Sequence, residues 1–268
     1  MKAKLKSLFK FRRQAFAYPY VLFMMIFIVV PLVLVLVNAF IDDYSSAITL
    51  DNIVAFFSEG NSLKTLGISI LIGVLTTVAC LLIGYPVAYI LVKYKMGKLI
   101  VLLFVLPMWV NFLLRTMSMA AIFNKLGWAL ANNYVAVFIG MVYNYLPFMI
   151  MPLYTSIESV DKSYKEASFD LGADRISTFL KVTLPLTVPG ILSGITMVFI
   201  PTISTFAISE ILSEKTILLF GDSINAKFQS GLYGVGSVMS IVMLIFVIIS
   251  NVIMSKFNSN QQGARSIW

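Results

Sequence analysis

Six apolar runs, each long enough to cross a lipid bilayer, constrain this sequence more than any other feature. They cover Tyr18–Phe40, Leu66–Val92, Leu99–Phe123, Tyr134–Tyr154, Val188–Ser209 and Gly234–Met254. A helix of about 20 apolar residues spans the hydrocarbon core of a bilayer. With 59% hydrophobic and 12% charged residues, a soluble protein would leave too much apolar surface in water. We predict an all-α polytopic membrane protein with six transmembrane helices, forming a single domain over residues 1–268.

The distribution of Lys and Arg predicts the orientation of this chain. Most of them lie in the amino terminus, in residues 93–98, in residues 158–185 and in the tail. The opposite set of connecting segments carries only Lys64, Lys125, Lys215 and Lys227. Because cationic loops stay in the cytoplasm, we expect both termini and the loop over residues 158–185 to be cytoplasmic.

Composition excludes several classes of function. The chain has no histidine and a single cysteine, Cys80, so a disulfide framework, a histidine-ligated metal site and histidine-based catalysis are not available. The net charge of +8 lies in particular loops and reports topology, not nucleic-acid binding. No paired carboxylates or Ser/Lys dyad occur within the spans, which argues against an intramembrane enzyme.

The loop between spans four and five is too long and too patterned to be a passive connection. Ser163 as N-cap, with Glu166 three residues later, forms a capping-box pattern, and Gly172 suits the left-handed residue that ends a helix. These signals predict a first helix over residues 164–171. A second helix is predicted to begin behind Asp174 and to end at Pro185.

The predicted first helix has the composition of a docking surface. Small Ala167 and Ser168 allow close approach of a partner, whereas Phe169 and Leu171 offer apolar contacts. Asp170 adds a polar rim. The loop is therefore interpreted as a compact knob that contacts another protein.

At these residues the sequence resembles the membrane permeases of bacterial ABC importers, whose signature is a Glu-Ala-Ala segment, a glycine, an isoleucine and a Leu-Pro pair. The matching residues are Glu166, Ala167, Ser168, Gly172, Val182, Leu184 and Pro185. Ser168 replaces the second alanine and Val182 replaces the isoleucine. In that family this segment is the coupling helix, which inserts into a groove of the ATPase subunit.

The resemblance implies a type I ABC importer permease fold and an ATPase-docking role for this loop. The implied docking residues are Tyr164, Glu166, Ala167, Ser168, Phe169, Asp170, Gly172, Leu184 and Pro185. Glu166 has an alternative role, which is to cap its own helix.

The resemblance also implies the partners of the chain. They are a second permease subunit, two ATPase subunits that bind ATP and Mg, and a soluble substrate-binding protein, all at a bacterial plasma membrane. The sequence contains no GxxxxGK[ST] phosphate-binding loop, so this chain does not bind ATP by that route. We therefore expect a transport subunit that carries no cofactor and is not itself an enzyme.

Three further segments are similar to the permease of spermidine/putrescine importers, namely Leu106–Thr116, Tyr145–Glu158 and Met197–Leu212. The resemblance implies polyamine import. Permeases for sulfate, molybdate, iron or phosphate, which have related stretches, remain alternatives. A secondary transporter or channel is a further alternative, disfavoured by the scarcity of intramembrane carboxylates and by the patterned loop.

A substrate pathway is expected to offer hydroxyls, acids or aromatic faces to a polycation. The candidate lining residues are Thr202, Thr205, Ser209 and Glu210 on span five, with Trp109 and Tyr145 as aromatic walls. Each hydroxyl has the alternative of bonding to its own helix, and each aromatic that of lying at the membrane interface. The related permeases often have an acid at the position of Thr205, and its absence here weakens the case for charge recognition.

Two other features of the spans leave alternatives open. Arg115 is the only charge well inside a span, and we expect it to pair with Glu210 or to reach the interface rather than to contact substrate. Gly190 and Gly194 form a small-residue pair that favours close helix packing, either between two permeases or within one chain.

Overall fold

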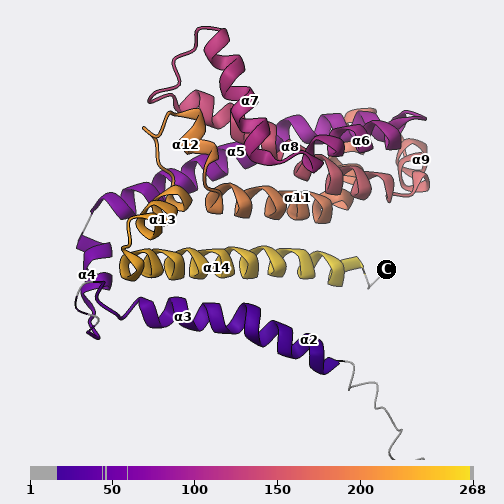
Figure 1. Cartoon of the computed structure of the whole chain (residues 1–268). Coiled ribbons are helices and arrows are strands. Elements are labelled where there is room, and N and C mark those ends of the chain that lie inside the picture. Colours follow the sequence, from indigo (N-terminus) through magenta and orange to yellow (C-terminus); the bar gives the residue numbers. More distant parts are fainter. Residues whose placement is uncertain (1–16, 44, 46, 59, 266–268) are drawn as a thin grey trace, which may run out of the picture. The chain divides into compact units, whose positions relative to one another are not determined.

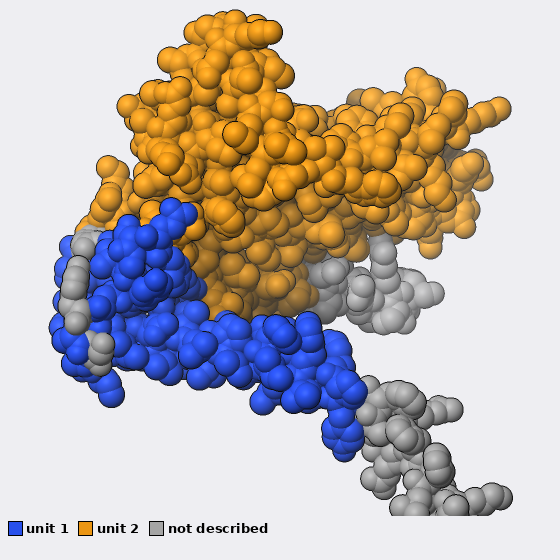
Figure 2. Space-filling view, in the orientation of Figure 1, with its two compact units in different colours: residues 1–58, 227–242 blue, residues 59–226, 243–268 orange. Residues whose placement is uncertain are grey.

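The computed structural model describes residues 17–43, 45, 47–58 and 60–265 (Figure 1). The amino-terminal Lys and Arg residues that contribute to the predicted orientation lie outside these residues. The described chain is helical, and its only β pairing is an isolated antiparallel bridge between Ile41 and Ile48. It divides into two compact units, residues 1–58 with 227–242 and residues 59–226 with 243–268 (Figure 2). Helices α13 (Phe220–Gln229) and α14 (Tyr233–Arg265) contribute to both units, and the single domain remains a prediction.

The first unit contains the first predicted span, confirmed as a continuous helix over Tyr18–Asn38. It consists of α2 (Ala17–Met24), the π-helical segment η2 (Met25–Val29) and α3 (Val30–Asn38). Pro31 is the second residue after the π segment. A proline clashes with the carbonyl four residues earlier and cannot donate to it, and a wider π turn relieves that clash without breaking the helix.

The core of the second unit is a bundle of α5 (Gly60–Lys93), α8 (Tyr134–Glu158) and α11 (Leu184–Ser204), which run side by side in Figure 1. Their contact is lined by fully buried apolar side chains such as Cys80, Met149 and Val198. Prolines inside these helices are tolerated because neighbouring helices shield the freed carbonyls from lipid. The second and fourth predicted spans are confirmed by α5 and α8.

The glycine pair of α11 packs within the chain. A Cβ atom on Gly190 would lie 2.2 Å from the Cβ of Ser156, and one on Gly194 would lie 2.5 Å from the sulfur of Met149. Both neighbours belong to α8. These glycines therefore set the distance between α11 and α8. Of the two predicted roles, packing between chains or within one chain, the structure supports packing within one chain.

The third predicted span is broken. The chain forms α6 (Gly97–Val105), a 3-10 turn η3 (Leu106–Trp109) and α7 (Phe112–Lys125), with a bend of 93° between the α6–η3 segment and α7. Pro107 cannot continue the hydrogen bonding of α6, and Val110 is extended. The side chain of Asn111 then caps α7 by accepting a bond of 2.8 Å from the backbone N–H of Leu113. A continuous helix over Leu99–Phe123 was thus a wrong prediction.

The fifth predicted span also ends earlier than expected. Helix α11 stops at Ser204, Thr205 is extended, and Ala207 has a left-handed φ of 74°. The short α12 (Ile208–Leu212) then turns away from the bundle axis. In the described residues, five helices are long and apolar enough to span a membrane, or six when the bent α6–α7 pair counts as one span.

We predict that Gly190→Val will destabilise the protein, because its added side chain must displace Ser156 or the backbone of α8. Overpacking of this kind costs about 1–3 kcal/mol or more. The matched control is Gly67→Val on α5, since a Cβ atom there meets nothing within 4 Å. Thermal unfolding of the purified variants measures the difference, and equal melting temperatures would contradict the packing role.

Candidate functional site

The predicted coupling loop contains a helix that begins earlier than expected. Helix α9 covers Lys162–Asp170, and its N-cap is Asp161, whose carboxylate accepts a 2.9 Å bond from the backbone N–H of Ser163. That bond lowers the pKa of Asp161 below its ordinary value. The capping box of Ser163 and Glu166 was therefore a wrong prediction. A carboxylate on an extended residue satisfies the free N–H groups of the first turn and complements the helix dipole better than a hydroxyl does.

Gly172 ends α9 as predicted. Its φ is +81°, and it donates to the carbonyl of Phe169 at 2.9 Å while Ala173 donates to Ser168 at 3.0 Å. This pair of bonds is the Schellman motif, which satisfies the last carbonyls of a helix and requires a left-handed residue.

The second helix of the loop starts as predicted and ends differently. Asp174 is its N-cap, accepting from the backbone N–H of Ser177 at 3.1 Å. The helix passes through α10 (Arg175–Thr178) and the π segment η4 (Phe179–Thr183) into α11 without a break. Pro185 therefore does not end it. As at Pro31, the proline follows a π turn, and the wider turn relieves the clash of the proline ring with the preceding carbonyl.

The loop is connected to the helix bundle through side chains. The hydroxyls of Ser168 on α9 and Thr178 on α10 lie 3.0 Å apart and are hydrogen-bonded. One residue later, Phe179 packs edge-on against Tyr85 and Tyr89 of α5, with ring centroids 5.8 and 5.5 Å apart. Ser168, which stands where the signature has its second alanine, thus joins the two helices of the loop.

The predicted docking residues are mostly on the surface. Tyr164, Phe169 and the neighbouring Leu171 expose large apolar side chains, Leu171 with 89% of its surface accessible. Also exposed are Glu166, Ala167, Asp170, Gly172 and Pro185. Ser168 is half-buried, and Leu184 packs against the bundle core. The outer face of α9 is free to receive a partner, whereas Leu184 supports the helix that carries it.

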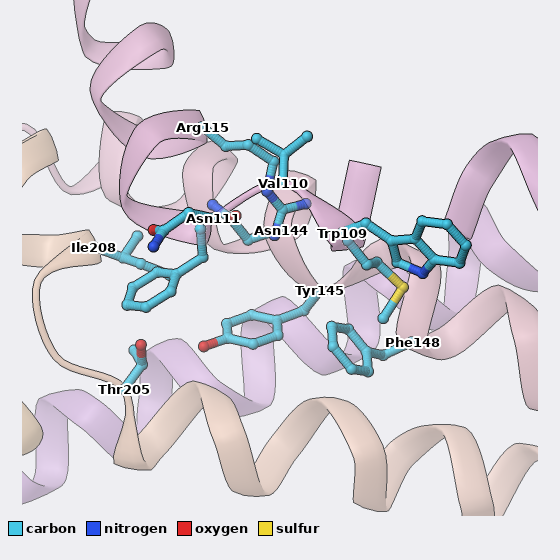
Figure 3. A pocket seen from close by; sticks show the side chains of 11 residues that line it. Trp109, Val110, Asn111, Arg115, Asn144, Tyr145, Phe148, Thr205 and Ile208 are labelled. Carbon is cyan, nitrogen blue, oxygen red and sulfur yellow. The ribbon is translucent and has the colours of Figure 1, made fainter. Parts of the chain in front are cut away.

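A cavity of about 420 Å³ lies where α6 and α11 break. Its lining residues are Met108, Trp109, Val110, Asn111, Phe112, Arg115, Asn144, Tyr145, Phe148, Thr205 and Ile208. Figure 3 shows Arg115 and Asn144 on one side and Thr205 on the other, with the Tyr145 hydroxyl directed toward Thr205. The cavity combines aromatic faces with amide and hydroxyl groups, and none of the described residues that line it carries a carboxylate.

The structure brings together only part of the predicted pathway. Tyr145 and Thr205 line the cavity, and Trp109 lies at its margin with 81% of its surface exposed. Thr202 does not line it. Its buried hydroxyl donates to the carbonyl of Val198 at 2.6 Å, which is the alternative of bonding to its own helix. The prediction that the hydroxyl residues of span five line the pathway along one helix was wrong, because α11 ends at Ser204.

The remaining two pathway residues bind elsewhere in the protein. The hydroxyl of the buried Ser209 donates to the carboxylate of Asp222. Glu210 forms an ion pair of 3.3 Å with Lys215, so the predicted pair with Arg115 does not form. Arg115 instead lines the cavity, and its buried Nε atom has no hydrogen-bond partner among the described residues.

Asp222, which the sequence analysis did not single out, anchors the segment after α11. Its carboxylate accepts bonds from the backbone N–H groups of Ala207 at 2.7 Å and Leu219 at 2.9 Å, in addition to the Ser209 hydroxyl. The residue is 2% exposed, and burial raises its pKa against the opposing effect of these bonds. Asp222 thereby fixes the backbone that positions Thr205 at the cavity.

Comparison with known proteins places the chain in a family. The family model of the binding-protein-dependent transport system inner membrane component matches residues 80–261. The chain belongs to this family. It is thus a membrane transport subunit, a multi-pass protein of the bacterial cytoplasmic membrane.

Named relatives and solved structures agree with that assignment. The chain is 35% identical to the Haemophilus influenzae spermidine/putrescine transport system permease protein PotB, over 82% of the chain and 87% of the relative. It is 36% identical to the Escherichia coli PotB, over 60% and 64%. The fold resembles a chain of the MetNI methionine ABC transporter (TM-score 0.58, 16% identity, 74% and 95% covered). It also resembles a chain of a bacterial alginate ABC transporter (TM-score 0.63, 18% identity, 91% and 96% covered). The type I ABC importer permease fold is confirmed.

We predict that Asp222→Asn will destabilise the end of the bundle at which α11 stops. An amide has one acceptor oxygen, so in either orientation its NH2 group faces the backbone N–H of Ala207 or of Leu219. Leaving one buried donor unsatisfied costs about 1–3 kcal/mol. A lower melting temperature is expected, with Glu214→Gln, an exposed acid in a nearby turn, as the control. A melting temperature equal to that of the control would refute the anchoring role.

Proposed function

We propose that this chain is the membrane-spanning permease of an ATP-binding-cassette importer for polyamines, with spermidine and putrescine as the first candidates. The observation that carries the proposal is its 35% identity, over 82% of the chain, to a permease named for these two substrates. The cavity is compatible with such a cargo. Tyr145, Phe148 and Phe112 offer aromatic faces, which attract ammonium groups by cation–π interaction.

The proposed energy source is a partner ATPase that docks on α9. Two ATPase subunits would bind ATP and Mg, while a second permease and a soluble substrate-binding protein complete the importer. The chain itself would bind no cofactor and hydrolyse no ATP. In support, α9 exposes Tyr164 and Phe169 to a partner. A movement of α9 is passed through the Ser168–Thr178 hydrogen bond to Phe179 and so to α5.

An importer for a small anion such as sulfate, molybdate or phosphate is the second candidate. The observation that favours it is Arg115, a cation that lines the cavity without a carboxylate beside it. A fixed cation attracts anions and repels ammonium groups. For polyamine import, Arg115 would lower the affinity of the cavity and thereby ease release of the cargo.

Uptake by the complete importer in proteoliposomes distinguishes these candidates. We expect ATP-dependent uptake of labelled putrescine that unlabelled spermidine inhibits and that sulfate, molybdate and phosphate leave unchanged. Inhibition by an anion and not by an amine would refute polyamine import. Uptake by this chain alone, without an ATPase, would instead indicate a secondary transporter or channel.

We predict that Gly172→Val will uncouple uptake from ATP hydrolysis. A β-branched residue is strained at a φ of +81°, by about 1–2 kcal/mol, and the Schellman turn that ends α9 would be lost. The expected result is a several-fold fall in ATP-driven uptake, with the variant still present in the membrane. Gly172→Asn is the matched control, because asparagine tolerates the left-handed conformation. Normal uptake by the valine variant would count against coupling through this loop.

A further inference from the structure

We infer that the side-chain oxygen of Asn144 is a binding group for a primary ammonium of the cargo, and that it selects N–H donors within the cavity. This inference rests on the proposed import of polyamines and assigns a specific atom to it. Sequence reasoning missed Asn144, because nothing in an apolar span distinguishes a cargo-binding amide from one that bonds to a neighbouring helix.

The orientation of the Asn144 amide is fixed by its surroundings. The residue lies on α8 and is 2% exposed. Its nitrogen donates to the carbonyl of Gly140 at 2.9 Å and to the hydroxyl of Thr116 at 3.4 Å. A backbone carbonyl accepts only, so the atom facing it has to be the NH2 group. The remaining atom, Oδ1, is therefore an acceptor held in one place.

This oxygen has no hydrogen-bond partner among the described residues, although it is buried and its residue lines the cavity (Figure 3). A buried acceptor without a partner is unfavourable, and native proteins satisfy such groups with water or a ligand. The cavity, at about 420 Å³, has room for either. A buried, unsatisfied acceptor on a residue that lines a cavity of this size is available to a donor that enters the cavity.

The chemistry of the cavity matches an ammonium better than an anion at this atom. A primary ammonium carries three donors and no acceptor, whereas the oxygens of sulfate only accept and would face the carbonyl oxygen unfavourably. The rings of Tyr145 and Phe148 line the same cavity and attract the charge of the ammonium. Arg115 opposes that charge, so recognition depends on the hydrogen bond to Asn144 and not on ion pairing.

The test compares two dications that differ in their donors. Putrescine has primary ammonium groups, and 1,4-bis(trimethylammonio)butane has the same charge and no N–H. Binding of each is measured on the assembled permease–ATPase complex in nanodiscs without the soluble binding protein.

The wild type is expected to prefer putrescine. In Asn144→Leu the affinity for putrescine should fall about ten-fold or more, since a hydrogen bond to a charged group is lost. The affinity for the quaternary analogue should stay unchanged.

Two further variants keep the inference falsifiable. Asn144→Asp retains an acceptor at this position and adds charge, so it should keep or strengthen the preference for putrescine. If the leucine variant does not reach the membrane, the preference of Asn144→Asp for putrescine over the quaternary analogue tests the role of the Asn144 oxygen instead. Asn251→Leu makes the same substitution on an exposed face of α14 and should bind both probes like the wild type.

Several results would overturn the inference. They are no binding or no preference in the wild type, an equal loss for both probes in Asn144→Leu, or a lost preference in Asn144→Asp. If the wild-type importer takes up polyamines and one of these results is obtained, only the role of Asn144 fails. If it takes up none, the proposed function itself fails.

Discussion

The need to satisfy backbone hydrogen bonds in a medium without water governs this structure. A helix inside a bilayer meets that need by itself, and a break meets it only where side chains or neighbouring segments replace the lost bonds. The chain breaks within predicted spans at Val110 and at Thr205. Asn111 caps the helix after the first break, and Asp222 holds the backbone after the second. Both breaks border the cavity, so the cavity exists because the helices stop there.

The loop over residues 158–185 differs from these breaks, since its second helix runs into the bundle without a break. The π turn η4 joins α10 to α11 without a break before Pro185. Phe179 of this turn packs against Tyr85 and Tyr89 of α5. A rigid, continuous element transmits a displacement over a longer distance than a flexible linker does. The same helix ends at the cavity, with Thr205 as its C-cap. The loop and the cavity thus lie at opposite ends of one continuous helix.

Under the proposed function, the cavity would recognise its cargo without a carboxylate from the described residues that line it, which would set it apart from an ion-pairing site. Aromatic faces, a buried amide oxygen and a hydroxyl provide weak, directional contacts, and Arg115 opposes strong retention of a cation. A transport pathway benefits from this balance, because each cargo molecule has to leave as readily as it enters.

The sequence by itself determined that the protein is a multi-span membrane protein, where most of the spans lie, and where the first loop helix ends and the second begins. Apolar runs, Gly172 and Asp174 act on their immediate neighbours, so their effect can be predicted from the residues around them. Two predictions about the loop were wrong because a neighbouring residue or turn changed the effect of a local signal. Asp161 and not Ser163 caps α9, and the π turn η4 allows the helix to continue through Pro185. Only the tertiary structure decided where Gly190 packs, that Asp222 holds the segment after α11, and that Asn144 keeps a free acceptor at the cavity. These outcomes depend on contacts between residues far apart in the sequence, and no local pattern records which buried polar group finds its partner.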